Sequence, residues 1–165
     1  MKKSILIILI TTHMIACGIY SFTGASIPSD ANSFSVTNFS SNTANSPASL
    51  NHILTEDLKD LLISQTNLDL TESEGDLHFL GEITKYKITP IAIKSNETAS
   101  KNRLTIEIKI KYQNKIDKKQ NFENTFNRYR DFNSSENLLD IEKILIEEIS
   151  KELIEDVFNK AFVNW

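Results

Sequence analysis

The stretch RLTIEIKIKYQ, residues 103–113, decides the fold because apolar and polar residues alternate along it without interruption. Successive side chains of a β-strand point to opposite faces of the sheet, so this pattern predicts a strand with one buried and one solvated face. One-sided burial of this kind is typical of an antiparallel sheet. The residues expected on the buried face are Leu104, Ile106, Ile108, Ile110 and Tyr112.

The segments on either side of this strand also have strand patterns. Residues 122–132, FENTFNRYRDF, follow a charged loop and are predicted to form the return strand of a hairpin. Residues 76–93 precede it, and their apolar positions change parity near residues 84–85, which predicts a β-bulge there. Pro90 is expected to end regular pairing because it has no amide hydrogen to donate. A further strand is predicted over residues 33–40.

Two other segments repeat their apolar residues at three- and four-residue spacing, as amphipathic helices do. The first follows Ser46-Pro47, read as a cap and first helical residue, and the second follows a cap at Ser134 or Ser135. The resulting order, β-α-β-β-β-α, predicts an α+β fold. We expect a two-layer sandwich, with two helices packed on one face of a mostly antiparallel four-stranded sheet, formed by residues 33–165 as one domain.

The N-terminus has the pattern of a lipoprotein export signal. Two lysines precede the apolar run SILIILI, residues 4–10, and the small Ala16 comes directly before Cys17. That run is shorter than the roughly 20 residues needed to span a bilayer. We therefore expect residues 1–16 to be a removed signal peptide and Cys17 to carry a diacylglycerol and acyl modification. A soluble secretory signal with a chance cysteine, or a buried strand, remain as alternatives.

Residues 17–32 are then the lipidated N-terminus and its tether. Two glycines in residues 18–27 suit a flexible leash, whereas the aromatic and aliphatic residues there suit contact with a barrel wall or lipid. Cys17 is the only cysteine, which excludes an internal disulfide and a cysteine-rich zinc site. Apart from the modification of Cys17, no cofactor is expected.

The sequence has no arrangement of residues that suggests catalysis. His52 is predicted on the first helix and His78 pointing outward on a strand, and neither has the spacing of a metal-binding motif. The chain has four glycines and no glycine-rich phosphate loop. We therefore predict no catalytic residues and no metal site, and expect that the protein is not an enzyme.

Charge is distributed unevenly along a chain whose formal net charge is −4, a balance that argues against nucleic-acid binding. Residues 85–130 contain twelve basic and four acidic residues, whereas the predicted helices are acidic. The lysines could form a solvated face that discourages edge pairing, or they could bind a polyanion such as a phosphorylated lipid. The candidate anion-binding residues are Lys85, Lys87, Arg103, Lys109, Lys111, Arg128 and Arg130.

Several phrases in the chain resemble the LptE family of lipopolysaccharide-assembly lipoproteins, in the form found in Bacteroidetes-type bacteria. They are CGIYSFTGASIP, GDLHFLGEITKYKITP, RLTIEIKIKY, FENTFNRYRDF and FNKAFVNW. The resemblance covers essentially the whole chain after the signal and implies the same sandwich fold. Of individual site residues, it carries over only Cys17, at the lipidation position.

The resemblance also implies a non-catalytic role at the outer membrane. Members of the family plug the outer-membrane β-barrel LptD, support its assembly and help deliver lipopolysaccharide to the outer leaflet. The expected partners are thus an LptD-type barrel, lipopolysaccharide, and the membrane through the lipid anchor, with the domain facing the periplasm or inside the barrel lumen. The alternative is a lipoprotein adaptor or ligand-binding module of another outer-membrane or secretion complex.

Overall fold

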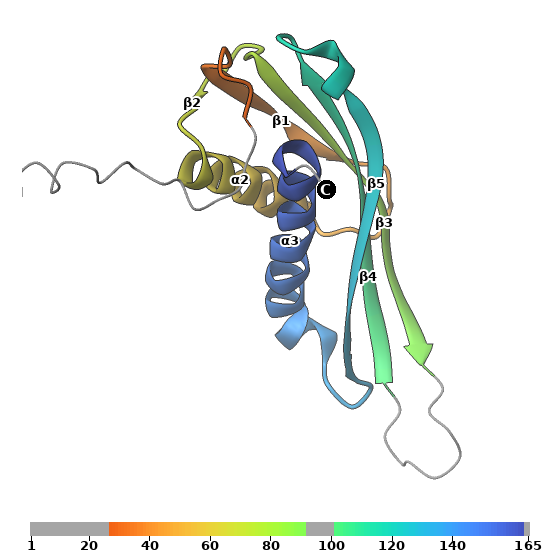
Figure 1. The fold of residues 1–165 in the computed structure, drawn as a ribbon. Coiled ribbons are helices and arrows are strands. Elements are labelled where there is room, and N and C mark those ends of the chain that lie inside the picture. The colour runs from red at the N-terminus through yellow and green to blue at the C-terminus, as the bar shows by residue number, and fades with distance from the viewer. Residues whose placement is uncertain (1–26, 92–100, 164–165) are drawn as a thin grey trace, which may run out of the picture.

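The computed structural model describes residues 27–91 and 101–163, and in them two helices cover one face of a sheet (Figure 1). The predicted two-layer α+β sandwich is therefore confirmed. Cys17, the signal over residues 1–16 and most of the tether over residues 17–32 lie outside the described residues. The elements are β1 (Ser33–Ser41), α2 (Ala48–Gln65), β2 (Asp69–Leu70), β3 (Leu77–Ile91), β4 (Lys101–Asn114), a 3-10 turn (Lys118–Gln120), β5 (Phe122–Asn133) and α3 (Leu138–Phe162).

The sheet has five strands in the order β2-β1-β3-β4-β5, where four were predicted. The additional strand, β2, is two residues long and pairs parallel with β1. β1 also pairs parallel with β3, because α2 carries the chain back across the layer before β3 begins. The sheet is therefore mixed, and only its β3-β4-β5 portion is antiparallel.

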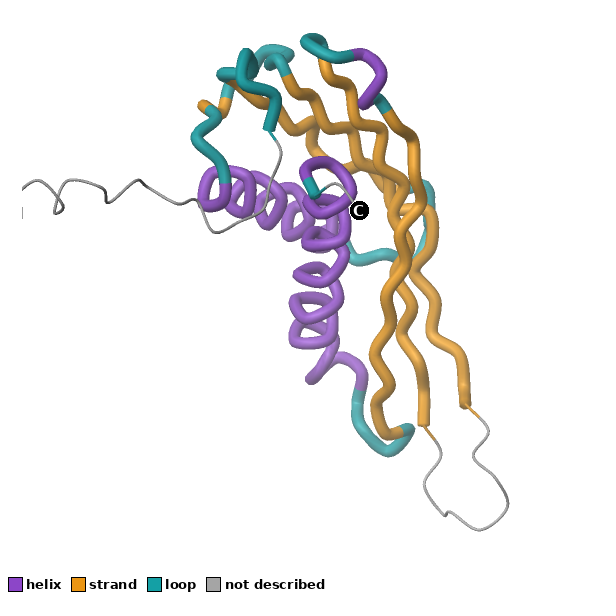
Figure 2. The backbone as a smooth tube through the Cα atoms, viewed as in Figure 1, coloured by secondary structure: helices purple, strands orange, loops and turns teal. Residues whose placement is uncertain are grey.

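β4 occupies the centre of the antiparallel portion, as its alternating sequence predicted. Leu104, Ile106, Ile108 and Ile110 are completely buried, and Tyr112 is 1% exposed. Figure 2 shows β3, β4 and β5 extending beyond α2 at the end where β3 ends and β4 begins, with only α3 alongside them. There the hydroxyl of Tyr86 on β3 donates a 2.6 Å hydrogen bond to Glu142 on α3.

The predicted irregularity in β3 is confirmed, but the prediction for Pro90 is wrong. The register of β3 against β4 shifts between Ile83 and Lys85, which is the expected bulge. Pairing then continues through Pro90, which lies opposite Asn102. β1 pairs with β3 only as far as Ile83, so Pro90 lies on a sheet edge, where proline is tolerated.

The helices begin one to three residues later than predicted. Pro47 is the cap residue of α2, and the side chain of Asn137, not of Ser134 or Ser135, caps α3 by accepting from the amide of Leu139. Both helices bury one stripe against the sheet and each other. The fully buried members of these stripes are Leu50, Leu54, Leu58, Leu62, Ile149, Leu153 and Val157.

Gly75 stands where the loop before β3 passes directly over β1. A Cβ atom there would lie 2.7 Å from the carbonyl carbon of Phe34, a backbone atom that cannot move aside cheaply. We expect Gly75→Ala to lower the free energy of unfolding by about 2–3 kcal/mol through overpacking, measured by urea denaturation. Ser73→Ala, in the same loop but exposed, is the control, and equal values for the two variants would contradict this account.

Candidate functional site

Strand register places the seven candidate anion-binding residues on opposite faces of the sheet. Arg128 lies opposite Ile106 and Arg130 opposite Leu104, so both arginines project on the helix side. The other five alternate with buried residues of β3 and β4 and project on the opposite side, which we call the far face. The sequence alone left open whether the arginine pair and the Lys109–Lys111 pair share a face, and the structure separates them.

Arg128 and Arg130 bind acidic residues of α3. Arg130 Nε lies 2.9 Å from Glu148 Oε2, and Arg130 also binds Glu152 through two guanidinium nitrogens. Arg128 Nη2 lies 2.6 Å from Asp156 Oδ1. The hydrogen bond from Arg130 lowers the pKa of Glu152, consistent with a paired carboxylate. These arginines therefore tie the edge strand β5 to α3, and their charges are already matched.

Three of the far-face bases are also paired. Lys109 Nζ lies 3.3 Å from Glu82 and 3.7 Å from Glu123, on the two neighbouring strands. The Arg103 guanidinium binds both carboxylate oxygens of Asp131, at 2.7 and 3.0 Å. The central carbon of the Arg103 guanidinium lies 3.7 Å from the centre of the Tyr129 ring. Pairs of this kind between strands hold the sheet in register and reduce the charge left for an external anion.

Lys85 is the third of these paired bases. The two remaining candidate anion-binding residues on the far face are Lys87 and Lys111. Lys85 Nζ lies 3.8 Å from Glu107. Lys87 and Lys111 are exposed, and neither forms an ion pair within residues 27–91 and 101–163. Lys101 shares this face and is likewise exposed and outside any ion pair of the described chain. The alternation of residues 103–113 extends back to Lys101, so the sequence pattern alone is enough to place Lys101 on this face.

The far face thus contains six bases and four acids, a smaller positive excess than the sequence count suggested. The bases are Lys85, Lys87, Lys101, Arg103, Lys109 and Lys111, and the acids are Glu82, Glu107, Glu123 and Asp131. Of the six bases, Lys87, Lys101 and Lys111 form no ion pair with a carboxylate of the described residues. Ammonium groups on strands can bind phosphate as point charges, without the bidentate geometry of arginine.

His78 is on the far face, as its parity predicted, but it is buried and not solvent-exposed. Its Nδ1 lies 2.6 Å from Ser35 Oγ and its Nε2 lies 3.3 Å from Thr37 Oγ1, both on β1. Ser35 Oγ also accepts a hydrogen bond from the amide of Gly75. Parallel pairing of β1 with β3, which sequence periodicity did not reveal, brings these groups together. This network joins two strands and their loop, and it requires no catalytic role for the histidine.

The described part of the chain contains no cluster of His, Cys, Asp or Glu side chains that could hold a metal ion. His52 lies exposed on α2, beside a shallow hollow that also includes Asn38 and Phe39. None of the helices within the described ranges is both long and apolar enough to cross a membrane. Other surface features of the described residues include the far-face lysines and a hollow between α2 and α3.

The comparisons with known proteins point to one family. The family model described as LptE, Lipopolysaccharide-assembly, matches residues 31–161, which span β1 to α3. No curated protein matches the sequence.

Solved structures with the same fold are distant in sequence. A minor lipoprotein from Acinetobacter baumannii is 12% identical with a TM-score of 0.52, and the match covers 79% of this chain and 91% of that chain. A protein from Xanthomonas campestris is 11% identical with a TM-score of 0.51, covering 82% and 91%. At these identities the likeness shows the fold alone.

Proposed function

Because the chain belongs to the LptE lipopolysaccharide-assembly family, we propose that it is an outer-membrane lipoprotein that plugs and supports assembly of an LptD-type β-barrel. In this role it assists the passage of lipopolysaccharide to the outer leaflet. The observation that carries the proposal is the match to the family over residues 31–161, nearly the whole described domain. The protein acts by binding and not by catalysis, and its lipid-modified Cys17 anchors it in the membrane.

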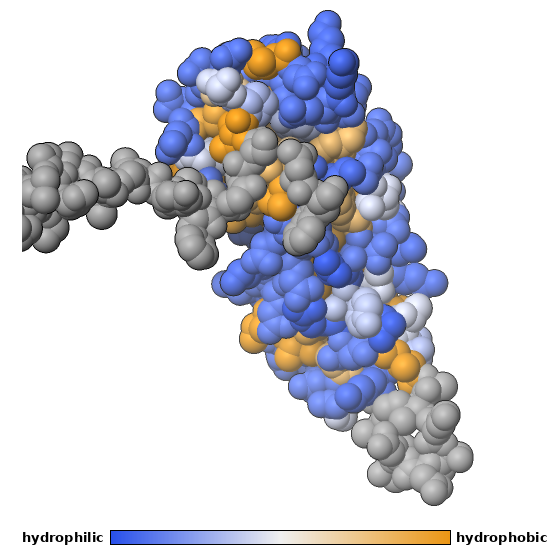
Figure 3. Space-filling model, viewed as in Figure 1, coloured by the Kyte–Doolittle hydropathy of each residue, from blue (hydrophilic) through white to orange (hydrophobic). Residues whose placement is uncertain are grey.

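The surface of the domain suits the lumen of a barrel. The interior of an outer-membrane barrel is polar, so a protein placed there needs a mostly hydrophilic surface. The face shown in Figure 3 is largely hydrophilic, with apolar patches interspersed. Large exposed apolar side chains include Leu139 and Ile144 near the start of α3, at 82% and 56% exposure. The hydrophilic surface supports placement of the domain in the lumen, away from the lipid.

Lys87, Lys101 and Lys111 are the residues that we propose contact the phosphate groups of lipopolysaccharide. They alternate with buried residues onto the far face, and none forms an ion pair in the described ranges. The pKa of Asp131, which its hydrogen bond with Arg103 lowers most, is however lowered further by the nearby Lys101 at the start of β4. Three further bases lie on the same face and contribute positive potential, although each already forms an ion pair with a carboxylate. They are Lys85, Arg103 and Lys109. Arg128 and Arg130 are not part of this surface.

Charge reversal on the far face tests the lipopolysaccharide contact. We expect Lys87→Glu combined with Lys111→Glu to weaken binding of purified lipopolysaccharide about tenfold, since exposed charge pairs contribute roughly 0.2–1 kcal/mol each and reversal also adds repulsion. The melting temperature should fall only slightly, because both side chains are exposed and only Lys111 lies opposite a carboxylate, Glu123 on β5. Binding is measured by surface plasmon resonance at two salt concentrations, and the effect should shrink at the higher one.

The control variant is Lys118→Glu combined with Lys119→Glu, which makes the same change in net charge on the exposed turn before β5. Equal weakening by both double variants would show that binding depends on net charge only and would remove the assignment to the far face. Reversal at Arg128 and Arg130 is unsuitable, because it would place acidic groups beside Glu148, Glu152 and Asp156 and disturb the fold.

A clean deletion tests the role in the cell. We expect loss of the protein to lower the amount of assembled LptD-type barrel and the amount of lipopolysaccharide at the cell surface. Reintroducing the wild-type gene should restore both quantities. Normal levels of both in the deletion strain would contradict the proposed function and would favour an adaptor role in another envelope complex.

A further inference from the structure

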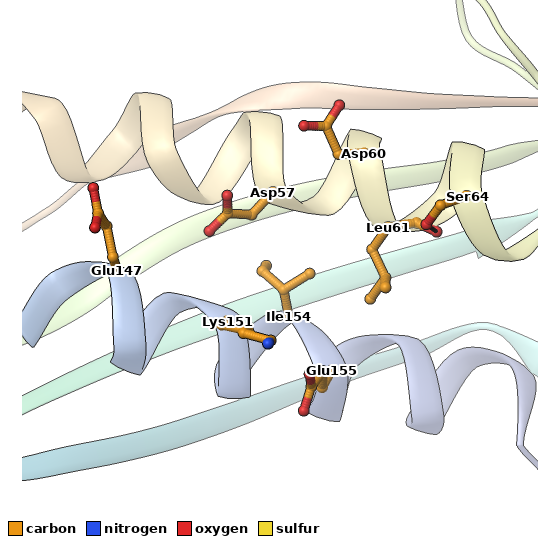
Figure 4. Close-up of a pocket in the computed structure, with 8 residues that line it drawn as sticks. All are labelled: Asp57, Asp60, Leu61, Ser64, Glu147, Lys151, Ile154 and Glu155. Atoms are coloured by element: carbon orange, nitrogen blue, oxygen red, sulfur yellow. Dashed lines mark hydrogen bonds between the residues drawn. The ribbon is translucent and has the colours of Figure 1, made fainter. Parts of the chain in front are cut away.

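A groove with an apolar floor runs between α2 and α3. Its larger hollow, of about 440 Å³, lies where Leu61 of α2 faces Ile154 of α3 (Figure 4). A second hollow of about 350 Å³ shares Leu61 and Glu155 with the first and continues to Phe158. The two hollows together form a channel along the line where the helices meet, and we call this channel the interhelical groove.

The rim of the groove is acidic. Asp57 and Asp60 from α2 and Glu147 and Glu155 from α3 line the larger hollow, against one base, Lys151 (Figure 4). Only Glu147 among these carboxylates has an ion-pair partner in the part of the chain that the structure describes, Lys143 at 3.7 Å. The groove therefore has more negative charge than its own side chains compensate.

The neighbouring acidic stripe of α3 shows the contrast. This stripe consists of the residues that directly follow Glu147, Lys151 and Glu155 in the sequence, namely Glu148, Glu152 and Asp156. All three acids of the stripe bind Arg128 or Arg130. One stripe of α3 is thus neutralised by β5, while the stripe beside α2 has no arginine facing it among the groove's lining residues. The two stripes differ in net charge because arginines of β5 contact one of them and no arginine lines the other.

Asp57 lies in this groove with other carboxylates around it. It is half-buried, and burial together with the nearby Asp60 and Glu147 raises its pKa above the ordinary value for aspartate. A cation bound beside it would lower that pKa again and stabilise the ionised form. A cation alone would leave the apolar floor of the groove exposed to water. The groove therefore favours a ligand that has both a positive charge and an apolar group.

We propose that the interhelical groove binds a segment of a partner protein in which an apolar side chain is flanked by lysine or arginine. The apolar side chain would contact Leu61, Ile154 and Phe158, and the cations would contact the acidic rim. Lipopolysaccharide phosphates are excluded from this surface by like charge. The groove is on the helix side, opposite the far face, so this interaction is additional to the proposed lipid contact and independent of it.

Among the described residues, the turn between β4 and β5 has similar chemistry and is exposed. Ile116 is 43% exposed there, and Lys115, Lys118 and Lys119 flank it. A second copy could present this turn to the groove, and the experiment must distinguish that occupant from a different protein. We commit to a different protein because Lys115 is already bound to Glu74 and its backbone carbonyl, which leaves the turn with two free lysines.

Photo-crosslinking in living cells tests the proposal with the full-length chain. The photoreactive residue p-benzoylphenylalanine replaces Ser64, which lines the groove and is exposed, or Ile63, which is exposed at 52% and does not line it. We expect a cross-link from position 64, and not from position 63, to a peptide of another protein with an apolar residue between basic ones. The cross-linked peptide is identified by mass spectrometry.

Charge variants complete the test. Asp57→Asn, Asp60→Asn and Glu155→Gln together should lower the yield from position 64 about tenfold, because they remove three carboxylates that would pair with the cations of the bound segment. The matched control, Asp69→Asn, Glu72→Gln and Asp140→Asn, removes three exposed acids outside the groove and should leave the yield unchanged. The proposal is overturned by an unchanged yield in the groove variant, a cross-link to residues 115–119 of a second copy, a lipid adduct, or no cross-link.

Discussion

Cys17→Ser is expected to abolish acylation of the protein and to remove it from the outer-membrane fraction. Serine keeps the size of the side chain but replaces the thiol that would accept the diacylglycerol unit. Each buried CH₂ group of an acyl chain contributes about 0.8 kcal/mol to membrane binding, and stable anchoring requires more than one chain. Loss of all chains therefore changes membrane association from stable to absent, the largest effect predicted for any single substitution here.

Incorporation of labelled palmitate and membrane fractionation measure this effect directly. The label should fall to background in Cys17→Ser and remain at the wild-type level in Ser21→Ala, a matched change in the same segment. The intact mass of the wild-type protein should correspond to a chain that begins at Cys17 and carries acyl groups. An unlabelled wild-type protein would show that residues 1–16 are not a lipoprotein signal.

Phe79→Ala is expected to lower the free energy of unfolding by about 3–5 kcal/mol, because it empties the centre of the aromatic part of the core. Phe79 is completely buried, its ring centre lies 4.8 Å from that of Tyr112, and Phe162 of α3 lies 6.3 Å away. The substitution therefore loosens contact between the sheet and the end of α3. In a domain of this size the melting temperature should fall by about 10–20 °C.

Thermal and urea unfolding of the two proteins measure this loss. Leu139→Ala is the control, because Leu139 is 82% exposed and its truncation should change stability by less than about 0.5 kcal/mol. A Phe79→Ala protein as stable as the control would mean that the aromatic contacts between β3, β4 and α3 do not form in solution.

Sequence periodicity predicted the features that depend on local alternation. The strand over residues 103–113 has one completely buried face, and the parity change in β3 corresponds to a bulge. Both follow from the two-residue repeat of a strand, which any central strand with one solvated face must obey. The two helices were predicted from the three- and four-residue spacing of their apolar residues, with errors of one to three residues at their starts.

Features that depend on register and on pairing between distant strands could not be predicted in this way. The sequence made Arg128 and Arg130 candidates for anion binding but left their face open, and their register with Ile106 and Leu104 places them against α3. His78 looked solvent-exposed until parallel pairing with β1 placed Ser35 against its ring. In each case the residue was predicted on the correct strand. Its role depends on the side chain that contacts it from a distant part of the sequence, which periodicity does not reveal.

We propose that the protein functions inside an outer-membrane β-barrel, and affinity purification measures whether it is bound there. The full-length protein with a C-terminal tag is purified from detergent-solubilised outer membranes, beside an unrelated tagged outer-membrane lipoprotein as control. We predict that an LptD-type barrel co-purifies in an amount comparable to that of the protein, and only with it. Recovery of the protein from the outer membrane without any barrel would contradict the claim.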